Sequence, residues 1–397
     1  MKRVGIIAEY NPFHNGHAGQ IAALRSRGAQ SVAVVMSGSF AQRGSPAVFS
    51  KFTRARAALE GGADLVAELP APWATAEADR FAEGGVFLLA ALGCDAICFG
   101  AECGGAEPLA ALAQILDDPG FDAGLQARHA AGGGSLAALR AQLAEERLPG
   151  AAALLAGPNN NLGVAYLRAI RRLGLPLQAI ALPREGAAHD APLPSGGVCA
   201  SAGALRGRIL AGDLAALRPY VPAGAFALYE EDAAEGAVLD EQAFSLSLLT
   251  ALRLGDAAAF ARLPGAGGEG LANLLARAAA EATSAAGLYA LLKSKRYTHA
   301  RLRRLALAAY LGLTDDLPRL PPYLRLLGGT KAGLQGIPGQ AAGAAVPVSH
   351  SLAQLARLPG AAGQVAALEA RAGALWALCL RRPRPASEEF TEKFIRP

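Results

Sequence analysis

The first half of the chain alternates short apolar runs with segments of helical periodicity. Apolar or β-branched runs of four to eight residues predict buried strands, and a glycine or proline ends most of the helical segments between them. Near-continuous apolar strands separated by helices are typical of a parallel sheet covered on both faces. We expect strands at 4–8, 31–38, 63–69, 96–99 and 177–182, and helices at 17–28, 49–60, 76–92, 106–147 (one or two) and 162–173.

From Asp213 onward the strand pattern fades and helical spacing takes over. Residues 240–312 carry apolar side chains at helical intervals, whereas a stretch rich in glycine and alanine at 328–349 predicts a loop or a short β segment. The sequence therefore predicts a Rossmann-like, doubly wound α/β domain over residues 1–212, followed by a mainly α-helical, basic domain over residues 213–397.

Composition narrows the class of protein only slightly. A chain of 397 residues with a net charge of +5 permits a nucleic-acid partner without requiring one. The spacing of Cys94, Cys98 and Cys103 matches no common zinc pattern, so we expect reduced thiols, no structural metal and a reducing cytosol. The start at Met1 leads into a strand, and no charge-free apolar run is long enough to span a bilayer. These features predict a soluble, cytoplasmic protein with no membrane partner.

A turn with two histidines follows the first predicted strand. The turn His14-Asn15-Gly16-His17 comes directly after Pro12, which cannot continue a strand. If a helix begins at His14, both imidazoles face one point, and the free N–H groups and positive dipole end of the helix favour an anion. The alternative is that one histidine caps the helix and the other lies on the surface. The position at the first strand-to-helix turn favours phosphate binding.

Other segments are needed to complete a nucleotide site, because the chain has neither a G-x-x-x-x-G-K-[ST] loop nor a G-x-G-x-x-G turn after the first strand. Ser201 and Arg206 place a hydroxyl and a guanidinium at a helix start, as a phosphate cradle or as an ordinary cap with a surface arginine. Asn159 and Asn160 offer amides to a base or ribose, or simply cap a helix. Residues 184–190, which include His189 and Asp190, form either a further contact or only a turn.

Two segments are rich in cations. Residues 50–56 begin a helix and indicate either a solvated face or a contact with a polyanion. Residues 293–304 are the most basic stretch, and Tyr297 within it can stack on a base. An exposed cationic helix face is the alternative, but the neighbouring basic segments favour a nucleic-acid surface. The candidate RNA-binding residues are Lys293, Lys295, Arg296, Tyr297, Arg301, Arg303 and Arg304.

Taken in order, these segments resemble the tRNA(Met) cytidine acetate ligase family, which is related to the H-x-G-H nucleotidylyltransferases. The likeness covers most of the chain, with two departures: Ala188 stands where the family often has tyrosine, and Gly203 where it has threonine. The segments that carry the resemblance are 5–17, 35–38, 42–44, 63–70, 99–102, 158–163, 184–190, 200–206, 295–298 and 322–328.

The resemblance implies a nucleotidylyltransferase-type fold and an ATP-dependent ligase. The family joins acetate to the wobble cytidine of elongator tRNA(Met) through acetyl-adenylate, giving N4-acetylcytidine. ATP is then a substrate with Mg²⁺ on its phosphates, and His14 and His17 are the catalytic residues. The implied ATP-binding residues are Ile7, Ala8, Glu9, Tyr10, Asn11, Pro12, Phe13, His14, Asn15, Gly16, His17, Ala18, Gly19, Gln20, Gly100, Asn159, Asn160, Arg184, Ser201 and Arg206.

Two other functions remain open at this point. A small-molecule adenylyltransferase of the coenzyme-biosynthesis kind has the same histidine turn but no use for a basic helical half. A non-catalytic RNA-binding protein that senses nucleotide would need no acyl transfer. The sequence leaves the oligomeric state open.

Overall fold

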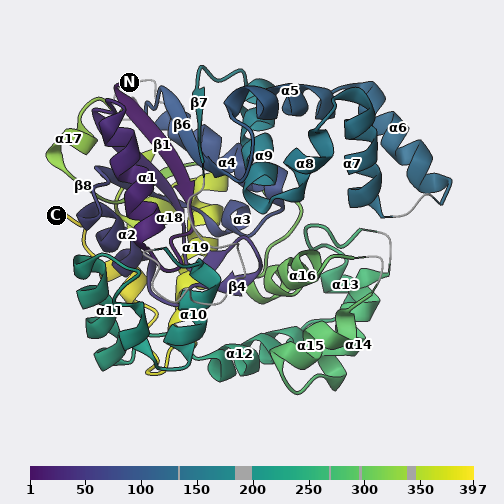
Figure 1. The fold of residues 1–397 in the computed structure, drawn as a ribbon. Coiled ribbons are helices and arrows are strands. Elements are labelled where there is room, and N and C mark those ends of the chain that lie inside the picture. Colours follow the sequence, from purple (N-terminus) through teal and green to yellow (C-terminus); the bar gives the residue numbers. More distant parts are fainter. Residues whose placement is uncertain (133–134, 184–198, 268–269, 295–296, 338–345) are drawn as a thin grey trace.

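A mixed sheet forms the centre of the computed structural model, which describes residues 1–132, 135–183, 199–267, 270–294, 297–337 and 346–397 (Figure 1). The strand order is β7-β6-β1-β2-β5-β8-β9. The strands from β7 to β5 are parallel, β8 runs antiparallel to β5, and β9 is parallel to β8. The predicted doubly wound α/β fold is confirmed. The strands are β1 (Arg3–Ala8), β2 (Ser31–Ser37), β5 (Leu65–Leu69), β6 (Ala96–Ala101), β7 (Gln178–Pro183), β8 (Leu324–Gly329) and β9 (Val348–Ser349).

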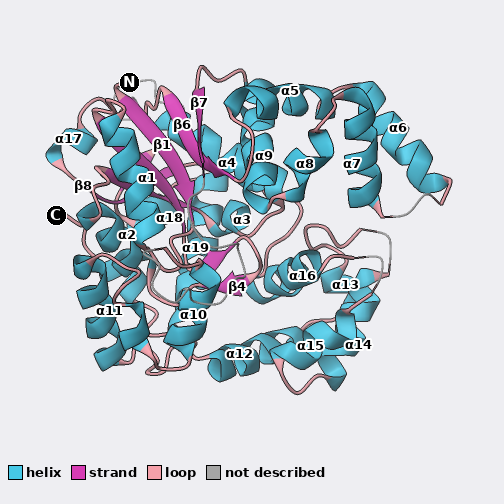
Figure 2. Ribbon diagram, viewed as in Figure 1, coloured by secondary structure: helices cyan, strands magenta, loops and turns pink. Residues whose placement is uncertain are grey.

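Helices cover both faces of this sheet, which explains why its central strands are apolar at nearly every position (Figure 2). Successive side chains of a strand point to opposite faces, so Ile6 and Val34 enter one core while Ile7 and Val35 enter the other. The first core is covered by α1 (Asn15–Ser26), α2 (Lys51–Glu60), α10 (Ala202–Leu210) and α11 (Ala223–Glu235); the second by α3 (Ala71–Ala74), α4 (Ala78–Ala91), α5 (Ala106–Leu116), α9 (Pro158–Leu173) and α18 (Leu352–Ala356).

The helical predictions for the first half need two corrections. The segment 106–147 forms three helices rather than one or two, because Pro119 begins a new helix at its N1 position. The helix expected from Leu162 begins four residues earlier, at Pro158. The additional helices are α6 (Pro119–Ala130), α7 (Leu136–Arg147) and α8 (Ala151–Ala156).

The second half is helical but also returns to the sheet. Its helices α12 to α16 lie together in the lower part of Figure 1, with α12, α14 and α15 at the lower edge and α13 and α16 above them. Residues 324–329 form β8, a wholly buried strand where the sequence predicted at most a short β segment further on. The division at residue 212 stays a prediction. The helices are α12 (Glu241–Leu254), α13 (Ala257–Phe260), α14 (Leu271–Glu281), α15 (Ala285–Leu292), α16 (His299–Leu311), α17 (Lys331–Leu334), α19 (Ala361–Leu378) and α20 (Glu388–Thr391).

The C-terminal tail packs against the rest of the chain. The amide of Arg381 donates to the Val238 carbonyl at 2.9 Å, and Ile395 forms a bridge with Gly328 of β8. The arginine- and proline-rich sequence of residues 381–385 predicts an extended and mobile tail, whereas these contacts hold the tail against the fold. Of the described helices, none combines the length and apolar character needed to cross a bilayer.

Candidate active site

The two histidines of the first turn lie ring against ring. Helix α1 begins at Asn15, and His14 is its N-cap. The Nδ1 atom of His14 accepts from the Gly16 amide at 3.1 Å, and Nδ1 of His17 accepts from the His14 amide at 3.3 Å. The ring centroids are 3.7 Å apart. His14 is a cap, as the alternative interpretation held, but His17 stacks on it instead of lying apart on the surface.

These hydrogen bonds fix which ring nitrogen carries the proton. A backbone amide donates to Nδ1 of each ring, so the proton of the neutral imidazole lies on Nε2. Both side chains therefore carry an Nε2–H group, a donor suited to a phosphate oxygen. The capping arrangement thus sets the tautomer that anion binding requires.

The amides at the start of α1 are engaged, in contrast to the expectation of free N–H groups. Asn15 donates to the Tyr220 carbonyl at 2.8 Å, Gly16 donates to His14, and His17 donates to the His14 carbonyl at 2.9 Å. The physical reason is a reciprocal capping box, which satisfies helix-start donors from within the chain. Affinity for an anion would come from the imidazoles and the helix dipole.

Two buried aromatic side chains pack against the histidine turn. Tyr10 and Phe13 are buried, and their ring centroids lie 4.7 and 5.7 Å from that of His17. Tyr10 has φ 46°, the one positive φ outside glycine in the described part of the chain. Such backbone conformations persist where the surrounding packing imposes them, often at ligand sites. Packing of Tyr10 and Phe13 therefore accompanies an uncommon backbone conformation directly before the histidine turn.

The second predicted phosphate segment reaches the same loop. Arg206 of α10 donates through Nη1 to the Asn11 carbonyl at 2.8 Å, which brings its guanidinium beside the histidine turn. Ser201 is buried and caps α10, its Oγ accepting from the Ala204 amide at 3.1 Å. The structure thus brings Arg206 to the candidate site and uses the Ser201 hydroxyl for capping.

The asparagine pair is committed to a carboxylate that the sequence-based site omitted. Glu102 accepts from the Asn159 amide at 2.9 Å and from the Asn160 amide at 2.8 Å, while Oδ1 of the fully buried Asn160 accepts from the Glu102 amide at 3.0 Å. These bonds join the end of β6 to the start of α9. Near them, a Cβ at Gly100 would meet no atom within 4 Å, so a ligand can approach this main chain closely. Nucleotide contact by either asparagine stays a prediction.

The hairpin of β3 (Phe40–Ala41) and β4 (Ser45–Pro46) connects the histidine turn to the basic helix. The Gln42 amide donates to the Glu9 carboxylate at 2.8 Å. At the hairpin tip, Gly44 has φ +80°, and a Cβ there would lie 2.8 Å from the main chain of Arg303 in α16. Glycine is needed for both reasons. The structure thus places the basic start of α16 against a loop that contacts β1's carboxyl end.

The candidate RNA-binding residues lie around this start of α16. Lys293 and Arg303 are exposed, and Arg301 and Arg304 are half-buried. The guanidinium of Arg301 lies 4.8 Å from the Tyr297 ring centroid. The remaining predicted site residues, Arg184, Lys295 and Arg296, lie outside the described part of the chain, as do His189 and Asp190.

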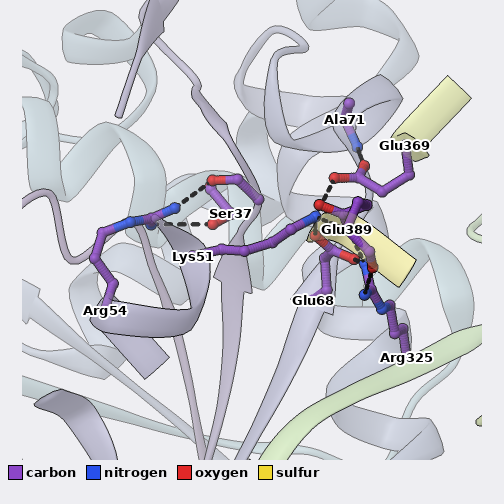
Figure 3. Close-up of polar contacts among 9 residues, drawn as sticks. Ser37, Lys51, Arg54, Glu68, Ala71, Arg325, Glu369 and Glu389 are labelled. Carbon is purple, nitrogen blue, oxygen red and sulfur yellow. Dashed lines mark hydrogen bonds and ion pairs between the residues drawn. The ribbon is translucent and has the colours of Figure 1, made fainter. Parts of the chain in front are cut away.

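Two cations of the segment 50–56 are buried. At these positions the segment is neither a solvated helix face nor an open contact with a polyanion. Lys51 is 2% exposed and Arg54 is 1% exposed. Lys51 Nζ lies 2.5 Å from Glu68, 3.0 Å from Glu369 and 2.7 Å from Glu389. Figure 3 shows these side chains converging from separate elements, with Arg325 at 2.9 Å from Glu68 on the far side. We call Lys51, Glu68, Arg325, Glu369 and Glu389 the buried charge cluster.

The cluster predicts a pH dependence of stability. Burial and the nearby Glu68 carboxylate raise the pKa of Glu369 to about 8, from an ordinary value of 4.5. Between these values the folded protein holds a proton that the unfolded chain releases, so Glu369 lowers stability as pH rises through that window. We expect Glu369→Gln, measured by urea unfolding from pH 5 to 9, to lose stability less steeply than the parent protein. Parallel pH profiles would contradict this expectation.

Metal-binding side chains do not gather in the described part of the chain: no group of three or more His, Cys, Asp or Glu residues is placed to hold an ion. Glu9 and Glu102, the carboxylates near the histidine turn and β6, accept main-chain hydrogen bonds.

Stacked imidazoles at the first crossover of a doubly wound sheet define the class of H-x-G-H nucleotidyl transferases. The sequence matches the HIGH Nucleotidyl Transferase family over residues 1–390. It is 37% identical to the tRNA(Met) cytidine acetate ligase of Levilactobacillus brevis, with 84% of each chain covered, and 36% identical to that of Bacillus subtilis, with 84% and 83% covered. The chain belongs to the tRNA(Met) cytidine acetate ligase family.

Solved structures agree with this assignment. The chain superposes on Thermotoga maritima TmcAL bound with alpha-thio ATP with a TM-score of 0.90, at 26% identity and full coverage of both chains. The apo form of the same protein gives 0.91 at 27% identity. Both superpositions cover the whole chain, so they include β8, the strand that the sequence pattern did not predict.

Proposed function

We propose that this protein activates acetate with ATP and transfers the acetyl group to the wobble cytidine of elongator tRNA(Met), giving N4-acetylcytidine. The names of its relatives state the ligase activity and the tRNA, and the solved neighbour binds an ATP analogue. The observation that carries the proposal is the stacked pair His14–His17 at the carboxyl end of β1. A small-molecule adenylyltransferase would leave the basic α16 surface unexplained.

The first step places negative charge next to the histidine turn. An acetate oxygen attacks the α-phosphorus of ATP, the bond to the leaving pyrophosphate breaks, and acetyl-adenylate forms. Acetate has no proton to lose at neutral pH, so this step needs charge stabilisation and no general base. The Nε2–H groups of His14 and His17, with the dipole of α1 and Arg206, supply that stabilisation.

The second step transfers the acetyl group. The exocyclic amine of cytidine attacks the acyl carbon, AMP leaves with the bonding electron pair, and the amine loses a proton. His189 and Asp190 are the bases that the sequence offers, and both lie outside the described residues. Mg²⁺ would enter with the ATP phosphates, since it keeps few protein ligands and favours phosphate oxygens. The site of action is the cytoplasm, where tRNA is modified.

Incubation with radiolabelled acetate, ATP and total bacterial tRNA, followed by nucleoside analysis, tests this function. We expect labelled N4-acetylcytidine and one AMP per acetyl group transferred. AMP formation that depends on a small phosphorylated acceptor instead of tRNA would support the adenylyltransferase. Absence of both pyrophosphate and acyl-adenylate would indicate a non-catalytic protein.

We propose the division of labour that the sequence predicts, with catalysis in residues 1–212 and tRNA binding in residues 213–397. Neutralising Arg301 and Arg303 together should weaken tRNA binding and reduce the slope of log K against log salt by about 0.7–0.9 for each phosphate that these cations neutralise in the parent protein. Filter binding between about 50 and 300 mM salt measures this slope. A matched change of Arg128 on α6 and Arg147 on α7, cations in surface ion pairs with Glu146 and Asp118, serves as the control. An unchanged slope would show that the α16 surface is only solvated.

A further inference from the structure

Arg54 is a buried cation whose hydrogen bonds end on the main chain. It lies on α2, one turn after Lys51, and is 1% exposed. Its Nη1 donates to the carbonyls of Glu9 at 2.6 Å and Ser37 at 3.1 Å, and its Nη2 donates to the Gly38 carbonyl. Figure 3 shows the guanidinium reaching the end of β2 at Ser37. Among the described residues, its hydrogen-bond acceptors are all main-chain carbonyls.

These carbonyls belong to the two loops that form the candidate site. Glu9 is the first residue after β1 and leads into the histidine turn, while Ser37 is the last residue of β2 and Gly38 leads from it into the hairpin that contacts α16. One planar guanidinium therefore ties the carboxyl ends of two adjacent parallel strands together. A fork of fixed geometry does this with less loss of side-chain freedom than a flexible ammonium.

Further contacts hold the other end of the segment that leads from β1 into the histidine turn. Arg54 Nε donates to the Phe49 carbonyl at 3.2 Å, and the Phe49 ring stacks on Tyr229 with centroids 4.4 Å apart. The hydroxyl of Tyr229 donates to the Phe13 carbonyl at 3.0 Å, directly before His14. The segment from Glu9 to Phe13 is thus held at both ends by groups that pack on each other.

The charge of Arg54 is also unusual for its burial. Its pKa is lowered to about 10 by burial, which leaves it cationic at neutral pH. Carbonyl dipoles solvate this charge and the nearby Glu9 and Glu68 carboxylates stabilise it, so a guanidinium cation sits beneath the carboxyl ends of β1 and β2. In open α/β sheets ligands bind beyond those ends, and a triphosphate there would be attracted.

We propose that Arg54 is a positioning residue for ATP: it sets the two strand-end loops in place and supplies buried positive charge beneath the triphosphate. This proposal rests on the proposed function, because it takes ATP as the ligand. Arg54 does not touch the reacting atoms, so its effect is expected in ATP affinity and KM more than in acetyl transfer once adenylate has formed.

Arg3 provides a matched control. It is a buried arginine at the amino end of β1, the strand whose carboxyl end is contacted by Arg54. It is 6% exposed and donates to the carbonyls of Leu92, Gly333 and Gln335, the last at 2.6 Å. We expect Arg54→Met to raise the Kd for ATP, measured by calorimetry without tRNA, about 10- to 100-fold. Arg3→Met should lose similar thermal stability while its ATP affinity stays within about twofold of the parent protein.

Conservative variants keep the test decisive if Arg54→Met does not fold. Arg54→Lys retains the charge but not the fork, so it should weaken ATP binding about 3- to 10-fold, with Arg3→Lys unchanged. In pyrophosphate exchange the KM for ATP should rise in the same order. Equal ATP affinity in the Arg54 and Arg3 variants would overturn the positioning role. Failure of the parent protein to bind ATP would instead overturn the proposed function.

Discussion

Replacing either stacked histidine with a residue that preserves helix capping should abolish most adenylate formation without unfolding the protein. Asparagine is a strong N-cap, so His14→Asn keeps the hydrogen bond to the Gly16 amide and removes the imidazole. Glutamine at N3 can reach back to the cap amide, so His17→Gln keeps the second bond. We expect acetate-dependent exchange of pyrophosphate into ATP to fall about 10²- to 10³-fold in each variant.

The alanine variants separate capping from chemistry. His14→Ala should lose the same activity and also about 1 kcal/mol of stability, because it removes the N-cap. Thermal melting of all the variants, with tRNA binding measured in parallel, provides the comparison. Retention of tRNA affinity is expected, since the basic surface lies on α16 and not on α1. Exchange at the parent rate in His14→Asn and His17→Gln would refute catalysis by the imidazoles.

The sheet could be predicted from sequence where local patterning and three-dimensional environment agree. Strands such as 31–37 are buried on both faces, so they read as continuous apolar runs bounded by glycine. β8 was not predicted because its sequence, Leu-Arg-Leu-Leu-Gly-Gly, contains a buried arginine and two glycines that weaken the strand pattern. Its glycines are required by close packing, since a Cβ at Gly329 would lie 2.9 Å from the Asp64 carbonyl.

The candidate site could be predicted only where consecutive residues carry the proposed chemistry. The turn from His14 to His17 is contiguous, so its proposed role can be inferred from the sequence. The sequence indicates a solvated face or a polyanion contact for Lys51 and Arg54 because their partners come from other segments, Glu369 and Glu389 for Lys51 and Glu9 and Gly38 for Arg54. Burial of a charge depends on tertiary contacts that periodicity does not report.

Those tertiary contacts make Lys51 the most sensitive position for stability. Its ammonium lies within 3.0 Å of three carboxyl groups that are at most 5% exposed at the side chain, and Arg325 is the other cationic partner of Glu68 and Glu389. Removing one partner of a buried ionic group leaves uncompensated charge, which costs more than the loss of the pair itself. We expect Lys51→Met to lower the free energy of unfolding by about 3–5 kcal/mol, measured by urea denaturation at pH 7.

Two further variants distinguish a buried charge imbalance from simple loss of an ion pair. Arg128→Met breaks an exposed pair with Glu146, and such pairs contribute about 0–1 kcal/mol, so its unfolding midpoint should barely move. Glu68 is ionised at pH 7, because Lys51 and Arg325 lower its pKa, and Arg325 remains beside it in Lys51→Met. Adding Glu68→Gln to Lys51→Met therefore removes one uncompensated negative charge, so the double variant should be more stable than Lys51→Met alone. If the double variant is equally or less stable, or if Lys51→Met unfolds at the same urea concentration as Arg128→Met, charge balance does not hold the C-terminal helices against the sheet. A rescue would show that uncompensated charge, more than the loss of one ion pair, destabilises Lys51→Met, at the place where α19 and α20 meet β5 and where Gly38 of the loop after β2 lies against Glu68 and Glu369.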